Sequence, residues 1–173
     1  MLERKHNPRA SARGRSAREP MPSPIRERLK LRLMHWSFLL ARPMTLGVRA
    51  IVADADERVL LVRHGYVSGW HFPGGGVEPG ETCVEAMTRE VEEEARVAID
   101  GPPLPHGVFL NTRRDHVAVY FVRTFRVLGE RAPDWEIEEA RFFPRSALPE
   151  GATAATWARL AEIFDSAPLS GRW

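Results

Sequence analysis

Apolar and polar residues alternate along much of the chain after residue 44, and this alternation predicts strands. Segments 45–54 and 58–64 flank the turn-forming sequence ADADE, so we expect these two strands to pair as a hairpin. Further alternating segments lie at 106–111, 115–127 and 138–143. Each has the period of two that is typical of a strand with one buried face.

Apolar residues spaced by three or four positions predict two helices in the same region, at 82–95 and 155–165. The first helix lies between two groups of strands, and the second follows the last strand. This order indicates an α+β fold with a mixed sheet and few helices. We expect one domain over residues 44–173, because a chain of 173 residues is long enough for one sizeable core.

A basic segment precedes this domain. Residues 1–32 hold ten Lys or Arg residues against three acids, a net charge of +7, and since the whole chain carries +2, the remainder carries −5. Residues 1–24 have few large apolar side chains, so we expect a disordered basic tail. Contact of this tail with nucleic acid or an anionic membrane is an alternative, but a solvated tail is favoured.

Residues 25–43 predict an amphipathic helix that ends at Pro43. Its apolar residues recur every three or four positions, at Ile25, Leu29, Leu33, Trp36 and Leu40. We favour a helix that packs on its own domain, or on a second copy of the chain in a homodimer, over one that lies on a membrane surface.

Cys83 is the single cysteine, which excludes an intramolecular disulfide and a multi-cysteine zinc site. No run of about eighteen apolar residues is present, and the N-terminus lacks the apolar core of a secretory signal. We therefore expect a cytoplasmic protein.

The glycine-rich segment WHFPGGGVEPGE, residues 70–81, directly precedes the first predicted helix. Its GGVEPGET portion has the spacing of a phosphate-binding P-loop, but Glu81 stands where that motif has its lysine. A carboxylate there would repel phosphate, which excludes the P-loop. Thr82 and Glu85 have the spacing of a capping box, so we expect the helix to begin at Thr82.

An acidic cluster follows on this helix. Val84, Met87, Val91 and Ala95 form the predicted apolar stripe. Glu90, Glu93 and Glu94 are spaced by three and four residues, so their carboxylates should project together beside the stripe. Like charges at a helix C-terminus repel, whereas a hard divalent cation such as Mg²⁺ or Mn²⁺ would stabilise them. We favour a metal site over a solvated acidic face.

The same residues resemble a known family. Gly75, Glu81 and the run REVEEEARV at 89–97 resemble the Nudix box, G-x5-E-x7-R-E-U-x-E-E-x-G-U, in which U is aliphatic. The resemblance covers residues 45–165 and implies a Nudix-like α/β/α sandwich with a mixed β-sheet. Arg96 replaces the last glycine of the box. We favour a left-handed backbone there over a helix that continues through it, because Val97 should already begin the next strand.

This resemblance implies hydrolysis of a small-molecule diphosphate, a nucleoside diphosphate linked to another moiety, by attack of water at phosphorus. It assigns Glu90 and Glu94 as metal ligands, together with the carbonyl of Gly74. Glu93 would bind metal or act as the general base. A pair between Arg89 and Glu81 would hold the loop against the helix.

Candidates outside the box rest on weaker patterns. Glu136 or Glu138 would supply a further carboxylate, although an exposed charge at a strand edge is nearly as well supported. Trp70 and Phe72 are candidates for stacking on a base, and Arg113 and Arg114 for binding a phosphate, but core packing and solvation, respectively, are the favoured readings of these pairs.

The main alternative function is a catalytically silent, nucleotide-binding Nudix-like module that regulates a partner. Loss of glutamates from the box would favour that alternative, and none is lost. The chain lacks the proline or tyrosine after the box that marks some substrate subgroups, so the sequence does not specify the substrate.

Overall fold

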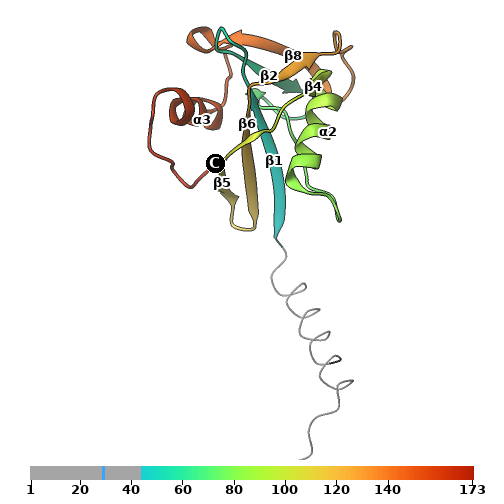
Figure 1. Ribbon diagram of the computed structural model, residues 1–173, viewed down its shortest axis with the longest axis vertical. Coiled ribbons are helices and arrows are strands. Elements are labelled where there is room, and N and C mark those ends of the chain that lie inside the picture. Colours follow the sequence, from blue (N-terminus) through green and yellow to red (C-terminus); the bar gives the residue numbers. More distant parts are fainter. Residues whose placement is uncertain (1–28, 30–43) are drawn as a thin grey trace, which may run out of the picture. The chain divides into compact units, whose positions relative to one another are not determined.

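The computed structural model describes Leu29 and residues 44–173, and the fold below concerns the unit Pro43–Trp173 (Figure 1). The predicted tail, residues 1–24, and all of the predicted helix 25–43 except Leu29 lie outside the described residues. In the described part of the chain, no helix has the length and apolarity needed to cross a membrane.

One sheet has three strands in the order β1-β6-β5. Strand β1 (Thr45–Val52) pairs in parallel with β6 (Asp115–Val122), which pairs antiparallel with β5 (Leu104–Thr112). The sheet is therefore mixed, as the order of elements predicts.

The second sheet is antiparallel and has the order β3-β2-β8. Its strands are β3 (Trp70–His71), β2 (Arg58–His64) and β8 (Ile137–Pro144). A third, two-stranded ladder joins β4 (Val97–Ile99) to β7 (Phe125–Val127).

The expected hairpin of β1 with β2 is wrong. The chain does turn at 54–57, where Asp54 N donates to Arg58 O, but only Ala53 bridges Val59 beyond that turn. Strand β1 instead forms eight residue pairs with β6, and β2 forms seven with β8. Each strand thereby gains a partner along its whole length, which one short hairpin would not provide.

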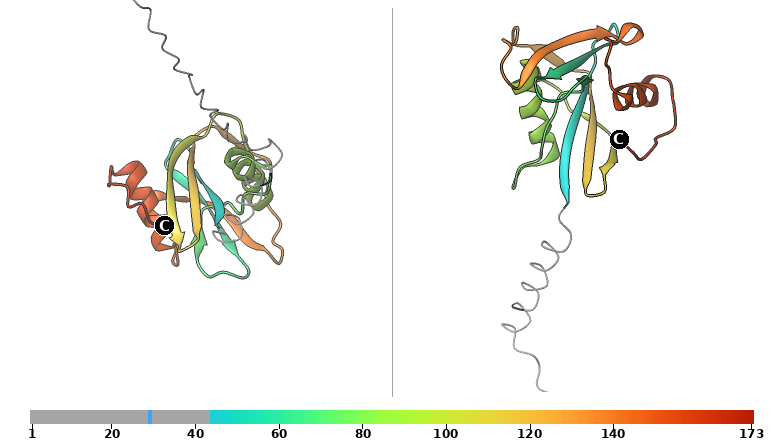
Figure 2. Two further views of the ribbon diagram at one scale, coloured as in Figure 1. Left: turned by 90° about the horizontal axis from the view of Figure 1, so that it is seen from below. Right: turned by 180° about the vertical axis from the view of Figure 1, so that it is seen from behind.

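Two helices cover opposite sides of the strands, α2 (Cys83–Ala95) and α3 (Ala154–Phe164), as Figures 1 and 2 show. A single 3₁₀ turn, η1 (Arg145–Ala147), precedes α3. Strand β1 contributes Val48, Ala50 and Val52 to the core under α2, and Ile51 to the core that includes Leu160 of α3. Because side chains alternate between the two faces of β1, this strand contributes to both cores of an α/β/α sandwich.

The buried stripe of α2 differs in part from the predicted one. Met87, Val91 and Ala95 are buried as expected, but Val84 is 39% exposed and Ala86 is buried in addition. Because Val84 lies in the first turn, next to the glycine-rich loop, its side chain is left at the margin of the core. Glu94 lies within the stripe and is buried with it.

Candidate active site

The glycine-rich loop runs antiparallel to β1 and is held to it by backbone hydrogen bonds. Val48 N donates to Gly75 O at 2.8 Å, Ala50 N to Pro73 O at 2.9 Å, and Val77 N to Leu46 O at 3.0 Å. A Cβ atom on Gly74 would overlap the carbonyl of Val48, and Gly74 has a φ of +143°. The close approach of loop and strand therefore requires glycine at this position.

Helix α2 begins where the capping box predicts. Thr82 is the N-cap, its Oγ1 accepts a hydrogen bond from Glu85 N at 3.2 Å, and Glu85 Oε2 accepts from Thr82 N at 2.8 Å. This reciprocal cap fixes the start of the helix directly after the loop.

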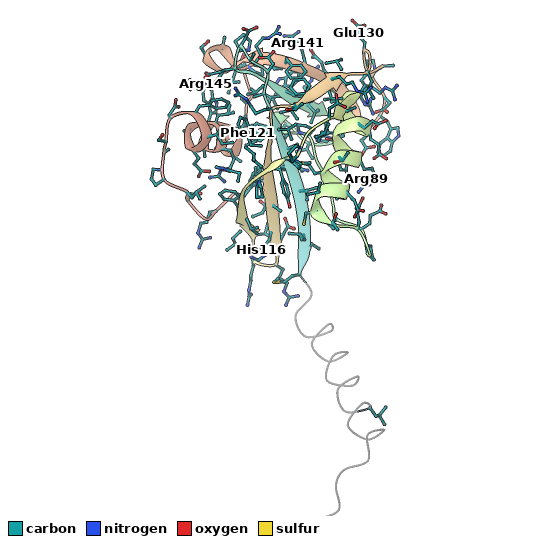
Figure 3. The ribbon with its side chains drawn as sticks, viewed as in Figure 1. Arg89, His116, Phe121, Glu130, Arg141 and Arg145 are labelled. Atoms are coloured by element: carbon teal, nitrogen blue, oxygen red, sulfur yellow. The ribbon has the colours of Figure 1, made fainter. Side chains whose placement is uncertain are left out.

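Arg89 joins the loop to the helix (Figure 3). Its Nε and Nη2 donate to the two carboxylate oxygens of Glu81 at 3.0 and 3.1 Å, which is the pair that the resemblance implies. Nη2 also donates to Gly76 O at 3.3 Å, and Nη1 donates to Glu90 Oε1 at 2.8 Å. These carboxylates raise the pKa of Arg89, so its charge is permanent.

Glu94 is the buried carboxylate of the site, with 5% of its surface exposed. Its Oε2 accepts a hydrogen bond from Gly74 N at 2.7 Å. Burial raises the pKa of Glu94 to about 7, and the nearby carboxylates of Glu90 and Glu136 act in the same direction. A proton or a cation is therefore needed to stabilise this carboxylate in place.

His64 lies beside Glu94, with its Nε2 atom 3.7 Å from Glu94 Oε1. Burial, together with the charges of Arg49 and His71, lowers the pKa of His64 to about 4. The imidazole is thus neutral near pH 7, so it does not form an ion pair with Glu94 despite their short separation.

The three box glutamates do not project together, contrary to the expectation from their spacing. Glu94 points into the core, and Glu90 lies against Gly75, where a Cβ atom would overlap its carboxylate. The Glu93 side chain is 62% exposed, and its Oε2 lies 3.4 Å from Arg89 Nη1. Within residues 44–173, no three His, Cys, Asp or Glu side chains converge closely enough to hold a metal ion.

The two candidate carboxylates outside the box lie in different surroundings. Glu136 follows a tight turn in which Asp134 Oδ1 accepts from Glu136 N at 2.9 Å, and its charge raises the pKa of Glu94. Glu138 is exposed and pairs with Arg63 at 3.1 Å. Only Glu136 is therefore a neighbour of the box carboxylates.

The types of donor atom near Glu94 suit a hard divalent cation, although the carboxylates do not converge in this structure. Glu90, Glu94 and Glu136 offer carboxylate oxygens, and Gly74 offers a carbonyl oxygen, which are the ligand types that Mg²⁺ and Mn²⁺ prefer. Burial raises the pKa of Glu94 even though the charge of Arg49 lowers it, so a bound cation would further favour the ionised carboxylate. Gly74 O is at present bound by the guanidinium of Arg49.

Arg49 was not among the residues expected from the sequence. It is the one charged residue in β1, and it is half-buried. A lone arginine in an apolar strand is a signal that sequence reasoning could have used, because an unpaired guanidinium is rarely buried. The sequence does not indicate which group Arg49 contacts, because its partner is a backbone carbonyl 25 residues later in the chain.

Trp70 and Phe72 belong to the core, which is the reading that the sequence favoured over stacking on a base. They are 6% and 1% exposed, and Trp70 packs edge-to-face on Phe143 with ring centroids 4.8 Å apart. Strand β3 contains Trp70 and pairs with β2, and the rings of Trp70 and Phe72 both belong to the core that includes Leu160 of α3. They are not accessible to a substrate base.

A cavity of about 270 Å³ adjoins the loop, between β1 and the β5–β6 turn. Its lining includes Arg49, Gly75, Gly76, Asn111, Asp115 and Trp173. Arg113 and Arg114 are exposed in the turn itself and do not line the cavity, although their neighbours do. The cavity and the carboxylates thus share Arg49 and the glycine-rich loop as a common border.

Comparison with known proteins agrees with this fold. The chain is 32% identical over 124 residues to the 8-oxo-dGDP phosphatase NUDT18 of Homo sapiens, which covers 67% of this chain but only 37% of that protein. It is 51% identical over 48 residues to the RNA pyrophosphohydrolase of Halorhodospira halophila, covering 28% of this chain and 26% of that one. The chain therefore spans well under half the length of these relatives.

Among solved structures, the MutT NUDIX hydrolase from Burkholderia pseudomallei superposes with a TM-score of 0.59 at 26% identity, covering 69% of this chain and 97% of that chain. A MutT protein from Bacillus halodurans gives a TM-score of 0.58 at 21% identity, over 75% of this chain and 85% of that one, which supports the fold alone. Residues 43–165 match the NUDIX domain. The chain belongs to the Nudix hydrolase family.

Proposed function

We propose that this protein is a metal-dependent hydrolase that cleaves the diphosphate linkage of a nucleoside diphosphate joined to another moiety. Water would attack at phosphorus. The observation that carries the proposal is the buried Glu94 carboxylate, with its raised pKa, next to Gly74 and the glycine-rich loop. A carboxylate in that setting is costly for stability unless a cation compensates it.

The residues would divide the work as follows. Glu90, Glu94 and the carbonyl of Gly74 would hold Mg²⁺ or Mn²⁺, with Glu136 as a further ligand. When bound, the cation would neutralise phosphate charge and lower the pKa of a coordinated water. Glu93 is the most exposed of the box glutamates that we assign, and it would complete the metal shell or accept the proton of the attacking water.

Positioning falls to Arg89 and Glu81. Their two hydrogen bonds hold the loop against α2, where Gly74 N donates to Glu94 Oε2. The cavity beside Gly75 and Gly76 would take the part of the substrate beyond the diphosphate. Arg113 and Arg114 lie between the cavity-lining residues Asn111 and Asp115 in the sequence. They would contact only a substrate that extends past the cavity.

The names of the relatives suggest which substrates to test first. The human relative is called an 8-oxo-dGDP phosphatase and the bacterial one an RNA pyrophosphohydrolase, and both names describe cleavage at a nucleotide phosphate chain. We propose the same reaction type for this chain. We also propose that it acts in the cytoplasm, with the small-molecule diphosphate as its partner.

The test is hydrolysis by the full chain of nucleoside diphosphates and nucleoside diphosphate-linked compounds, with Mg²⁺ or with a chelator. Glu94→Gln is expected to lower turnover by about a hundredfold or more, because it removes a metal ligand. Glu92→Gln is the matched control, since Glu92 lies on the same helix and is exposed. Reaction in ¹⁸O-labelled water should place the label on a phosphate product.

The two variants and the chelator distinguish the outcomes. Turnover by folded Glu94→Gln equal to that of the wild type would refute the metal-site assignment. Tight nucleotide binding without turnover by the wild type would instead support a silent regulatory module.

A further inference from the structure

Arg49 makes an unusual contact for a strand arginine. Its Nη1 atom donates to the carbonyl of Gly74, the same oxygen that we assign to a metal, and also to Val48 O at 3.2 Å. Its positive charge lowers the pKa values of Glu94 and His64. A guanidinium thus occupies the carbonyl oxygen that we assign to the metal, within the electrostatic reach of Glu94.

The loop does not need Arg49 to hold its position. Backbone hydrogen bonds from Val48, Ala50 and Val77 already join the loop to β1 on both sides of Gly74. The contact between Arg49 and Gly74 therefore adds charge rather than attachment. Both of its acceptors are neutral carbonyls, whereas arginine forms its strongest hydrogen bonds with carboxylate or phosphate.

The surroundings of Arg49 offer such an anion site. Arg49 lines the cavity of about 270 Å³ together with Gly75 and Gly76, on the border between that cavity and the box carboxylates. A substrate whose diphosphate reaches the carboxylates from this cavity passes Arg49. The planar guanidinium matches the paired oxygens of a phosphate better than an ammonium does.

We infer that Arg49 is an exchangeable counter-cation that binds the Gly74 carbonyl in the metal-free protein, yields that oxygen to the divalent cation, and then binds a substrate phosphate. This inference rests on the proposed function. It assigns Arg49, which lies outside the box, as a substrate-binding residue. It also makes one distinctive claim, that removing a positive residue strengthens metal binding while it weakens substrate binding.

The first experiment measures Mn²⁺ binding without substrate, by the loss of the free-ion electron paramagnetic resonance signal. Arg49→Met is expected to bind Mn²⁺ about tenfold more tightly than the wild type, because it frees Gly74 O and removes a repelling charge. Arg49→Gln keeps a polar group for the half-buried position and should change affinity in the same direction. Circular dichroism confirms that each variant is folded.

Two controls keep this measurement specific. Arg123→Met makes the same change in charge at an exposed site where the guanidinium lies 5.5 Å from the Phe121 ring centroid, and it should leave Mn²⁺ affinity unchanged. Measurement at about pH 9 keeps Glu94 ionised in every variant, so that proton competition does not hide the effect. Unchanged or weaker Mn²⁺ binding in both neutral Arg49 variants overturns the inference.

The second experiment separates KM from metal affinity. At saturating Mg²⁺, Arg49→Met is expected to raise KM for the diphosphate substrate by about tenfold or more, the effect of losing a hydrogen bond between charged groups. Arg49→Lys keeps the charge but lacks the planar guanidinium, so its KM should lie between those of the wild type and Arg49→Met. An unchanged KM in Arg49→Met overturns the phosphate contact.

The Mn²⁺ measurement also distinguishes this inference from the proposed function. If Glu94→Gln binds Mn²⁺ as tightly as the wild type, the assignment of the metal site is refuted, whatever the Arg49 variants show. Loss of Mn²⁺ binding in Glu94→Gln with no change in Arg49→Met or Arg49→Gln would leave the metal site in place and reject only the role of Arg49.

Discussion

Replacing Arg96 with glycine should stabilise the domain. Arg96 is the C-cap of α2 and has a left-handed backbone, with φ of 54° and ψ of 45°. Its N–H donates to Glu92 O at 2.9 Å, and its carbonyl accepts from Leu128 N at 2.8 Å, so the conformation is fixed at both ends. The side chain is exposed, so the backbone is the main cost of this residue.

The expected gain follows from three opposing terms. A left-handed conformation costs an L-residue about 1–2 kcal/mol, which glycine avoids. Glycine loses about 0.5–1 kcal/mol more conformational entropy on folding. Loss of a positive charge at a helix C-terminus costs about 0.3 kcal/mol at an exposed site. The net stabilisation of Arg96→Gly is about 0.5 kcal/mol, which corresponds to a rise of about 1–3 °C in Tm.

Arg96→Ala is the matched control, because it removes the same side chain and charge but keeps the left-handed strain. We expect it to be slightly less stable than the wild type. Urea unfolding followed by circular dichroism, with and without Mg²⁺, gives the free energy of unfolding for all three proteins. The difference between Gly and Ala isolates the backbone term, and a glycine variant less stable than the alanine variant would refute the reasoning.

Three further predictions concern stability and the N-terminal segment. In the metal-free protein the pKa of Glu94 rises from 4.5 to about 7 on folding, so the contribution of Glu94 to stability is greatest below pH 4.5 and falls by up to about 3 kcal/mol as the pH rises through 7. Glu94→Gln should show no such fall in denaturation with a chelator present, and an equal fall in both proteins would contradict this assignment. Burial of Glu162 opposes its ionisation, but hydrogen bonds from Arg159 and His106 outweigh burial and lower its pKa, so Glu162→Gln should lose about 3–5 kcal/mol of unfolding free energy by leaving a buried guanidinium unpaired; a loss below 1 kcal/mol would argue against it. Removal of residues 1–24 should leave turnover unchanged, and a soluble truncated protein with most of its activity lost would make that segment part of the substrate site.

Local features of the fold were predictable from sequence because they depend on a few neighbouring residues. The capping box needs only Thr82 and Glu85, and the structure contains both of its hydrogen bonds. The left-handed Arg96 followed from the closeness of the helix end to the next strand, which begins at Val97. Each of these inferences spans four residues or fewer.

Features that depend on distant partners were not predictable in the same way. A period of two shows that β1 has two faces, but it does not show that its partner is β6 rather than β2. The burial of Trp70 depends on the same missing information, since Trp70 lies in β3, whose partner is β2. The contact of Arg49 with Gly74 depends on the strand partner of the loop.

The electrostatic argument from sequence considered only a metal ion as the source of positive charge for the box glutamates, which do not project together in the structure. Repulsion among the glutamates was expected to require a cation, and in the structure two arginines supply positive charge. Arg89 is bound by the carboxylates of Glu81 and Glu90, so a metal ion would have to break charged hydrogen bonds to displace it. Arg49 is bound only by two neutral carbonyls. Hydrogen bonds between charged partners are roughly twice as strong as neutral ones. Arg89 is therefore suited to a permanent role in the loop, and Arg49 is the guanidinium that a divalent cation can displace at lower cost.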